Sequence, residues 1–191
     1  MTSCSKSENE NQIPHKPMAE FDETKSNWKR LLEEQHNVSI DGDESISLLT
    51  GPPASGESLD LLEKKFGVDF PDEFRSFYSQ HNGYGQTYER DGSVEKDWLI
   101  LPMERMTTFD TLSDWKTEAH REAAKKLLVI IDFGTGDVAG YKLNESGGII
   151  SSELHVFSHE RIDFDPNQNP QEFIFQYWDG IAHFLADEWA Y

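Results

Sequence analysis

The chain has 191 residues, and its 36 acidic against 17 basic side chains give a formal charge of −19. This length is enough for one domain with a substantial core and short extensions, and it excludes two large enzyme domains. Because so acidic a chain repels phosphate groups, direct binding to DNA, RNA or an anionic membrane is disfavoured. The five Trp and 12 Phe argue against a disordered chain, although hydrophobic residues make up only 36% of it.

The cysteine count and the apolar runs predict where the protein works. Cys4 is the single cysteine, so no internal disulfide is expected. It lies in a polar N-terminal stretch that lacks the apolar run of a secretory signal. The longest unbroken apolar run, Leu127–Ile131, is far too short to span a membrane. Together these features predict a cytoplasmic protein.

The first 51 residues are expected to form an extension before the main domain. Residues 1–16 are polar and aperiodic, which predicts a disordered tail. Residues 17–51 are expected to hold a helix over Met18–His36 and then a linker. The apolar stripe of this helix consists of Phe21, Trp28, Leu31 and Leu32. Trp28 favours packing of the helix on the domain, but the sequence leaves open whether it packs or swings free.

The clearest pattern predicts a helical hairpin. The first helix is expected between a cap at Ser55 or Ser58 and a stop at Gly67, and the second from Pro71 to Asn82-Gly83. Apolar residues recur at helical spacing in both: Leu59, Leu62 and Phe66, then Phe74, Phe77 and Tyr78. Phe70 is expected to pack against Phe74 at the start of the second helix.

The remainder predicts strands followed by a helix. Tyr84–Asp97 is interpreted as a polar loop or hairpin, Trp98–Leu101 as a strand, and Ser113–Lys126 as a helix with Trp115, Ala119 and Ala123 inside. Short turns separate three further strands, Leu127–Phe133, Val138–Leu143 and Ile149–Phe157, so antiparallel pairing is expected. A single aromatic helix is predicted from Asn169 onward, with Phe173, Tyr177, Ile181, Phe184 and Leu185 as its stripe. This order predicts an α+β fold: a mainly antiparallel sheet packed against helices.

Motifs of common enzymes are absent from the sequence. It contains no P-loop, no G-x-S-x-G, no H-E-x-x-H and no G-x-G-x-x-G. Asp132-Phe133-Gly134 spells a kinase triplet without its accompanying loops, and we interpret it as part of a tight turn. His155 and His159 are interpreted as surface histidines, and Asp41–Glu44 as a solvated acidic loop. We therefore expect no catalytic residues, no cofactor and no metal.

The acidic charge is concentrated toward the C-terminus. Residues 127–191 hold eleven acidic and two basic side chains, a net charge of −9. Such polarisation attracts cationic partners and raises association rates. Solubility alone is the alternative explanation.

The stretch GPPASGESLDLLEKKFGVDFPDEFRSFYSQHNGYG resembles the opening of the SUKH superfamily, the Smi/Knr-like domains of fungal cell-wall regulators and bacterial immunity proteins. That family begins with x-I-x-x-L-E-x-x-x-G, followed by L-P-x-x-[YF]-x-x-[FY] and N-G. The matching residues are Leu59, Leu62, Glu63, Phe66 and Gly67, then Phe70, Pro71, Phe74, Phe77, Asn82 and Gly83. Phe70 replaces the usual Leu. Trp98–Pro102 and the hairpin LLVIIDFGTGDVAGYKL extend the resemblance, so residues 52–191 are expected to form the Smi/Knr-like domain.

The resemblance implies non-catalytic protein binding. Bacterial members neutralise polymorphic or contact-dependent toxins, often nucleases, whose basic clefts suit an acidic partner. The main hypothesis is therefore an immunity protein that binds a cognate basic toxin. A regulatory scaffold of the fungal type that binds signalling proteins is the second, and an enzyme built on acids and histidines is the third.

Candidate partner-binding residues follow from exposed aromatic and acidic side chains. They are Tyr84, Tyr88, Glu89, Asp91 and Asp97 in a loop predicted to be exposed, the turn residue Asp137, and Asp163 and Asp165.

Overall fold

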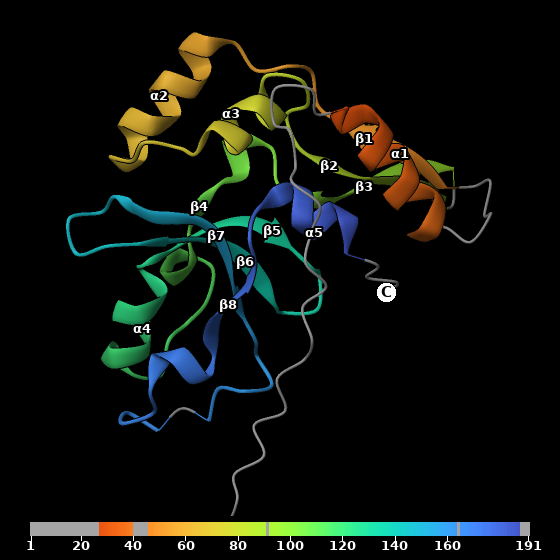
Figure 1. Ribbon diagram of the computed structural model, residues 1–191. Helices are drawn as coiled ribbons and strands as arrows, with labels where there is room; N and C mark the ends of the chain where they lie inside the picture. The colour runs from red at the N-terminus through yellow and green to blue at the C-terminus, as the bar shows by residue number, and fades with distance from the viewer. Residues whose placement is uncertain (1–26, 40–45, 91, 164, 188–191) are drawn as a thin grey trace, which may run out of the picture.

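The computed structural model describes residues 27–39, 46–90, 92–163 and 165–187, and Figure 1 shows a twisted sheet with helices on both faces. The strands in this part of the chain form one eight-stranded sheet in the order β1-β2-β3-β5-β6-β7-β8, with β4 paired to β5. All strand pairs are antiparallel, which confirms the predicted α+β fold. The strands are β1 (Ile46–Thr50), β2 (Tyr84–Arg90), β3 (Ser93–Ile100), β4 (Thr107–Thr108), β5 (Leu127–Asp132), β6 (Val138–Leu143), β7 (Ile149–Phe157) and β8 (Ile174–Trp178).

Two apolar clusters lie on opposite faces of the sheet. One face packs against α1 (Trp28–Ser39), α2 (Gly56–Phe66), α3 (Asp72–Tyr78) and α5 (Ile181–Ala186). The other carries α4 (Glu118–Ala124) and short 3-10 turns, among them η3 (Phe109–Thr111) and η4 (Pro170–Glu172). A third 3-10 turn, η2, spans Met103–Arg105. A sheet covered on both faces explains why β5 is almost entirely buried.

The helical hairpin has three of its four predicted ends, whereas α3 ends at Tyr78, four residues before the predicted stop at Asn82-Gly83. The Ser55 hydroxyl accepts a hydrogen bond from the Ser58 backbone N–H (3.1 Å) at the start of α2, and Gly67 ends that helix. Pro71 immediately precedes α3, and the Phe70 and Phe74 rings stack with centroids 3.8 Å apart. Since these capping and packing signals are local in sequence, the prediction succeeded at these three ends.

The helix before the domain packs on it. Trp28 is fully buried in α1, and its indole N–H donates to the Ser76 hydroxyl of α3 (3.0 Å). Its ring also meets Phe77 edge-on, with centroids 5.2 Å apart. The part of the predicted helix before residue 27, including Phe21, lies outside the described residues.

The predicted aromatic helix from Asn169 is wrong over its first half. Asn169 caps only the turn η4, and the next residues form β8, which pairs with β7. β-branched and aromatic residues suit a strand when a neighbouring strand is available for pairing, and β7 provides it here. The residues of this type in β8 are Ile174, Phe175, Tyr177 and Trp178. Gly180 then separates β8 from α5, so the C-terminal helix is the short segment Ile181–Ala186.

The helix predicted over Ser113–Lys126 begins later than expected. Thr117 caps α4 by accepting from the His120 backbone N–H (3.2 Å), so the helix starts at Glu118. Its buried residues are His120 and Ala124 instead of Ala119 and Ala123. Trp115 packs against Phe109 ahead of the helix, because the chain bends between them.

A buried carboxylate connects the helical hairpin to the C-terminal helix. Glu73 on α3 is only 8% exposed and accepts hydrogen bonds from the backbone N–H groups of Ile181 (3.0 Å) and Ala182 (2.7 Å). These donors belong to the first turn of α5 and have no partner within the helix. A Cβ at Gly180 would collide with the same carboxylate, so a side chain there would displace Glu73 from these hydrogen bonds.

Replacing Glu73 with Ala should therefore leave two buried N–H groups without an acceptor. We expect the free energy of unfolding to fall by about 3 kcal/mol in urea denaturation. Asp72→Ala, on the same turn but exposed, is the control and should cost less than about 1 kcal/mol. Equal losses in the two variants would contradict the role given to Glu73.

Two buried tyrosines offer a matched comparison. The Tyr78 hydroxyl donates to the Leu101 carbonyl (2.8 Å), whereas the buried Tyr141 hydroxyl has no hydrogen-bond partner among the described residues. Tyr141→Phe should raise the free energy of unfolding by about 1 kcal/mol, and Tyr78→Phe should lower it by a similar amount. Denaturation of both variants checks the signs, and a loss of stability in Tyr141→Phe would contradict the assignment.

Candidate protein-binding surface

The sheet register brings three connections to one end of the sheet. Ile100, the last residue of β3, pairs with Ile131, so the β2–β3 hairpin extends past the end of β5 in the direction of the β5–β6 turn, and its own turn lies most of a strand length beyond this pair. Val138 pairs with both Asp132 and Phe157, so the loop after β7 leaves from the same end. The β6–β7 hairpin projects from the opposite end (Figure 1). We call the first of these the acidic end; it comprises the β2–β3 hairpin, residues 133–137 and residues 158–169.

The β5–β6 turn is the tight glycine turn that the sequence predicts. Gly134 and Gly136 have φ values of 70° and 99°, and the Asp132 carboxylate accepts from the Gly134 N–H (2.9 Å). Asp137 then reaches the loop after β7: its Oδ1 accepts from the His159 backbone N–H (2.7 Å) and lies 2.6 Å from the ring Nδ1. This contact fixes the turn against that loop.

Asp163 and Asp165 lie in a loop that they help to order. Asp163 Oδ1 accepts from the Asp165 N–H (2.8 Å), and Asp165 Oδ1 accepts from the Asn167 N–H (2.9 Å). The Gln168 side chain bridges this loop, accepting from the Asp163 N–H and donating to the Arg161 carbonyl. Both carboxylates are exposed, so the loop presents them in a defined conformation.

The β2–β3 hairpin presents some of its predicted residues and buries one. Glu89 and Asp97 are exposed, and Tyr88 is half-buried. Tyr84 is only 2% exposed, so the prediction of an exposed ring there is wrong. Tyr84 begins β2, where its side chain joins the main core. Asp91 lies outside the described residues.

The fold thus joins some of the candidates and separates others. The Asp137–His159 contact connects the turn to the loop of Asp163 and Asp165, although 22 residues separate the two partners. Glu89 and Asp97 lie apart from these residues, on the β2–β3 hairpin. The resulting surface carries exposed carboxylates on the β2–β3 hairpin and the loop after β7, and the half-buried Asp137 on the β5–β6 turn.

The described histidines lie apart from one another. No group of three or more His, Cys, Asp or Glu side chains that could hold a metal ion occurs within the described residues. His155 is buried, not on the surface as predicted, because β7 lies between β6 and β8. His159, by contrast, is exposed and held by Asp137.

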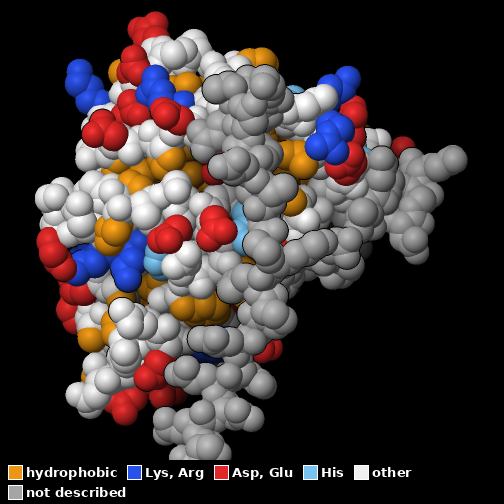
Figure 2. Space-filling view, in the orientation of Figure 1, with side chains coloured by type: hydrophobic (Ala, Val, Ile, Leu, Met, Phe, Trp, Pro, Cys, Tyr) orange, Lys and Arg blue, Asp and Glu red, His pale blue; other side chains and the backbone are white. Residues whose placement is uncertain are grey.

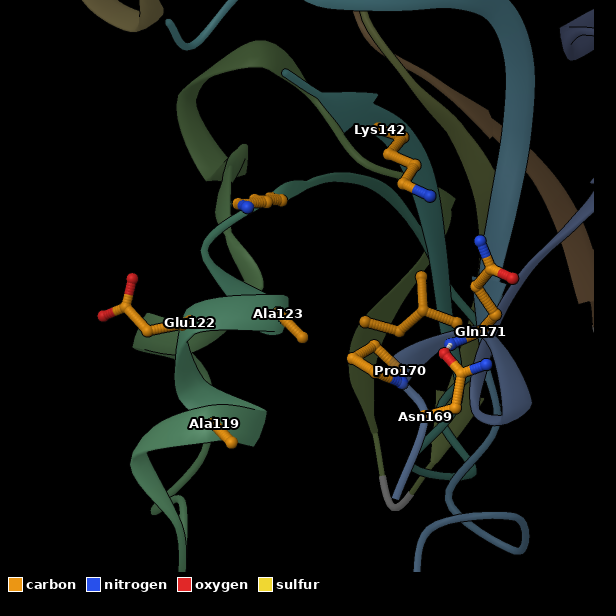
Figure 3. Close-up of a pocket in the computed structure, with 9 residues that line it drawn as sticks. Ala119, Glu122, Ala123, Lys142, Asn169, Pro170 and Gln171 are labelled. Atoms are coloured by element: carbon orange, nitrogen blue, oxygen red, sulfur yellow. Dashed lines mark hydrogen bonds between the residues drawn. The ribbon is translucent and has the colours of Figure 1, made fainter. Parts of the chain in front are cut away.

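Sequence reasoning missed a cavity on the face of the sheet that carries α4. It has a volume of about 380 Å³ and lies between α4, β6 and η4, with Lys126 and Lys142 among its lining residues (Figure 3). The sequence held one indication of this site. Lys142 is a basic residue within the strongly acidic stretch 127–191, whose only other Lys or Arg is Arg161.

Comparison with known proteins decides the family. The model of the SMI1/KNR4 family (SUKH-1) matches residues 53–187. The chain belongs to this family. Proteins of the SMI1/KNR4 family are generally non-catalytic, and SUKH proteins are known to bind partner proteins as immunity proteins. A search of functionally curated proteins found no match. Within the described residues, no helix is long and apolar enough to cross a membrane.

The buried histidine predicts a pH dependence of stability. Burial, and secondarily the positive charge of Lys142, lowers the pKa of His155 below its ordinary value. The unfolded chain therefore binds a proton on this ring below about pH 6.5, while the folded protein resists protonation. The stability that neutral His155 provides is complete above about pH 6.5 and is lost as the pH falls from there toward the folded pKa.

Denaturation at pH 8 and pH 5.5 measures this effect. His155→Gln should lose less stability between the two pH values than the natural protein, by no more than about 1.4 kcal/mol per pH unit. Lys142→Met should produce a smaller change in the same direction. An unchanged pH dependence in His155→Gln would contradict the assignment.

Proposed function

We propose that this protein is an immunity protein that binds a cognate toxin and neutralises it without catalysis, docking through the acidic end. The observation that carries the proposal is membership of the SMI1/KNR4 (SUKH-1) family together with the exposed, conformationally fixed carboxylates of Asp163 and Asp165 on that end. Figure 2 shows acidic side chains at the bottom of the molecule, around η4 and the loop before it.

The proposed partner is a basic enzyme, a nuclease above all. Nuclease clefts carry cationic side chains that hold phosphate groups, and rows of carboxylates can occupy the same positions. A net charge of −19 attracts such a partner over long distances and repels nucleic acid itself. The proposal places this encounter in the cytoplasm, in keeping with the single cysteine of the chain.

Fixed carboxylates favour tight docking for a further reason. Asp163 and Asp165 each use one oxygen to hold their own loop, and Asp137 uses one to hold the loop after β7. Because the loop conformation is set before binding, less conformational entropy is lost when a partner docks.

The second candidate is a regulatory scaffold of the fungal cell-wall type that binds signalling proteins. Family membership supports it equally. The two candidates differ in their partners, because a scaffold binds several cellular proteins and inhibits none of them.

Co-expression with a toxin encoded beside this protein tests the proposed function. Growth should be restored, and the two proteins should elute as one complex in size-exclusion chromatography. Toxic growth arrest that persists, with no complex formed, would contradict the immunity role. Recovery of several signalling proteins in place of one basic enzyme would support the scaffold.

Removing charges from the acidic end tests the surface separately. Asp163→Asn with Asp165→Asn keeps an acceptor oxygen on each side chain and removes two charges, and Glu89→Gln with Asp97→Asn does the same on the hairpin. Each pair should slow association with the toxin about tenfold at low salt, as measured by surface plasmon resonance.

The matched control is Glu57→Gln with Asp69→Asn, which removes two exposed charges around α2. It should change the association rate less than about twofold. Equal slowing in the control would show that only net charge matters and would contradict docking at the acidic end.

A further inference from the structure

The cavity beside α4 has the composition of a binding site. Ala119 and Ala123 of α4 form one wall, and Pro170 and Ile174 form the other. Figure 3 shows the two alanines facing Pro170 across the opening. A volume of about 380 Å³ lies within the range of cavities that hold small ligands.

A positive charge lies at the mouth of this cavity. Lys142 projects from β6 at the rim, with its amino group toward Gln171 (Figure 3). Lys126, the other lysine of the lining, forms an ion pair with Glu145. Lys142 has no ion-pair partner among the described residues, so its charge is available to a ligand.

The carboxylate in the lining does not cancel this charge. Glu122 pairs with Lys125, and Figure 3 shows its side chain pointing away from the cavity. Arg161, the other basic residue of the C-terminal third, lies over the Phe175 ring, 4.3 Å from its centroid. The charge of Lys142 contributes to the lowered pKa of His155, which agrees with the position of Lys142 on β6, next to β7.

Two side-chain amides complete the polar part of the lining. Asn169 Oδ1 accepts from the Gln171 backbone N–H (3.1 Å), an arrangement that leaves the Asn169 NH₂ as a donor. The Gln171 side-chain amide makes no hydrogen bond to another described residue. An ammonium group and two amide donors above apolar walls match an anion that carries an apolar stem.

We propose that this cavity binds a carboxylate attached to a short apolar chain, with the carboxylate on Lys142 and Gln171 and the chain between α4 and η4. The ligand is either a free organic acid or the C-terminal carboxylate of a peptide, since both present the same chemistry. The proposal is independent of toxin binding at the acidic end. Figure 2 agrees with it, showing basic side chains gathered at the left of the molecule, beside the β6–β7 hairpin.

Titration of the isotope-labelled full chain with hexanoate, followed by amide NMR spectra, tests the site. We expect saturable shifts for the amides of Ala123, Lys142 and Gln171, with a Kd on the order of 1 mM. Hexanamide has the same length without the charge and should bind at least fivefold more weakly. Absent shifts, or equal binding of the two compounds, would overturn the proposal.

Single substitutions test the contribution of the Lys142 charge and that of the cavity volume separately. Lys142→Met should weaken hexanoate binding at least fivefold, and Ala119→Phe, which fills the opening from an exposed position, should abolish it. Lys64→Met removes an exposed charge on α2 and should leave binding unchanged. Unaltered binding in Lys142→Met and Ala119→Phe would place the ligand elsewhere and overturn the proposal.

The two sources of carboxylate are distinguished with peptides. A tetrapeptide ending in leucine with a free C-terminus is compared with its C-terminally amidated form. Tighter binding of the free-carboxylate peptide than of hexanoate assigns the site to a chain terminus, and tighter binding of hexanoate assigns it to a free acid. Equal binding of the free and amidated peptides, combined with no hexanoate binding, would contradict both.

Discussion

The buried Glu73 carboxylate is the interaction on which the helical face of this molecule depends. A six-residue helix is too short to be stable alone, and α5 begins where Glu73 accepts its first N–H groups. Four residues of α5 enter the main core, and α1 packs against the same helix. The N-terminal helix precedes the family match at residue 53, so a carboxylate inside that match also supports a helix outside it.

Local signals explain which elements could be predicted from the sequence. Ser55, Gly67 and Pro71 mark helix ends by their own chemistry, and short turns require antiparallel strands. Residues 169–185 begin with such a signal at Asn169 and Pro170, but it starts only the turn η4, and the aromatic residues after it fit a helical stripe as well as a strand. Their pairing with β7 decides between the two, and this contact is visible only in the fold. Glu73 shows the same limit. The sequence indicates a favourable charge at a helix start, but the two N–H groups that donate to this carboxylate lie 108 and 109 residues further along the chain.

The sequence predicts the type of surface, exposed carboxylates on loops, but it does not predict all of the residues that form it. Exposed acids such as Asp163 and Asp165 could be chosen because polar loops lie on surfaces. Tyr84 is buried because it starts a strand whose first side chain faces the core, a fact set by register. The Asp137–His159 contact and the cavity beside α4 arise where separate elements meet, so neither spacing nor composition along the chain specifies them.

The two proposed surfaces use electrostatics over different distances, which allows them to coexist in one acidic protein. Carboxylates at the acidic end act together, and their summed field attracts a basic protein before contact. That field disfavours anions in general, so a carboxylate enters the cavity only if short-range contacts outweigh it. Lys142 provides such a contact at a partly enclosed mouth, where a charge is less screened than on the open surface. The cavity therefore favours ligands whose apolar chain also fills it and rejects small inorganic anions, which gain only the charge interaction.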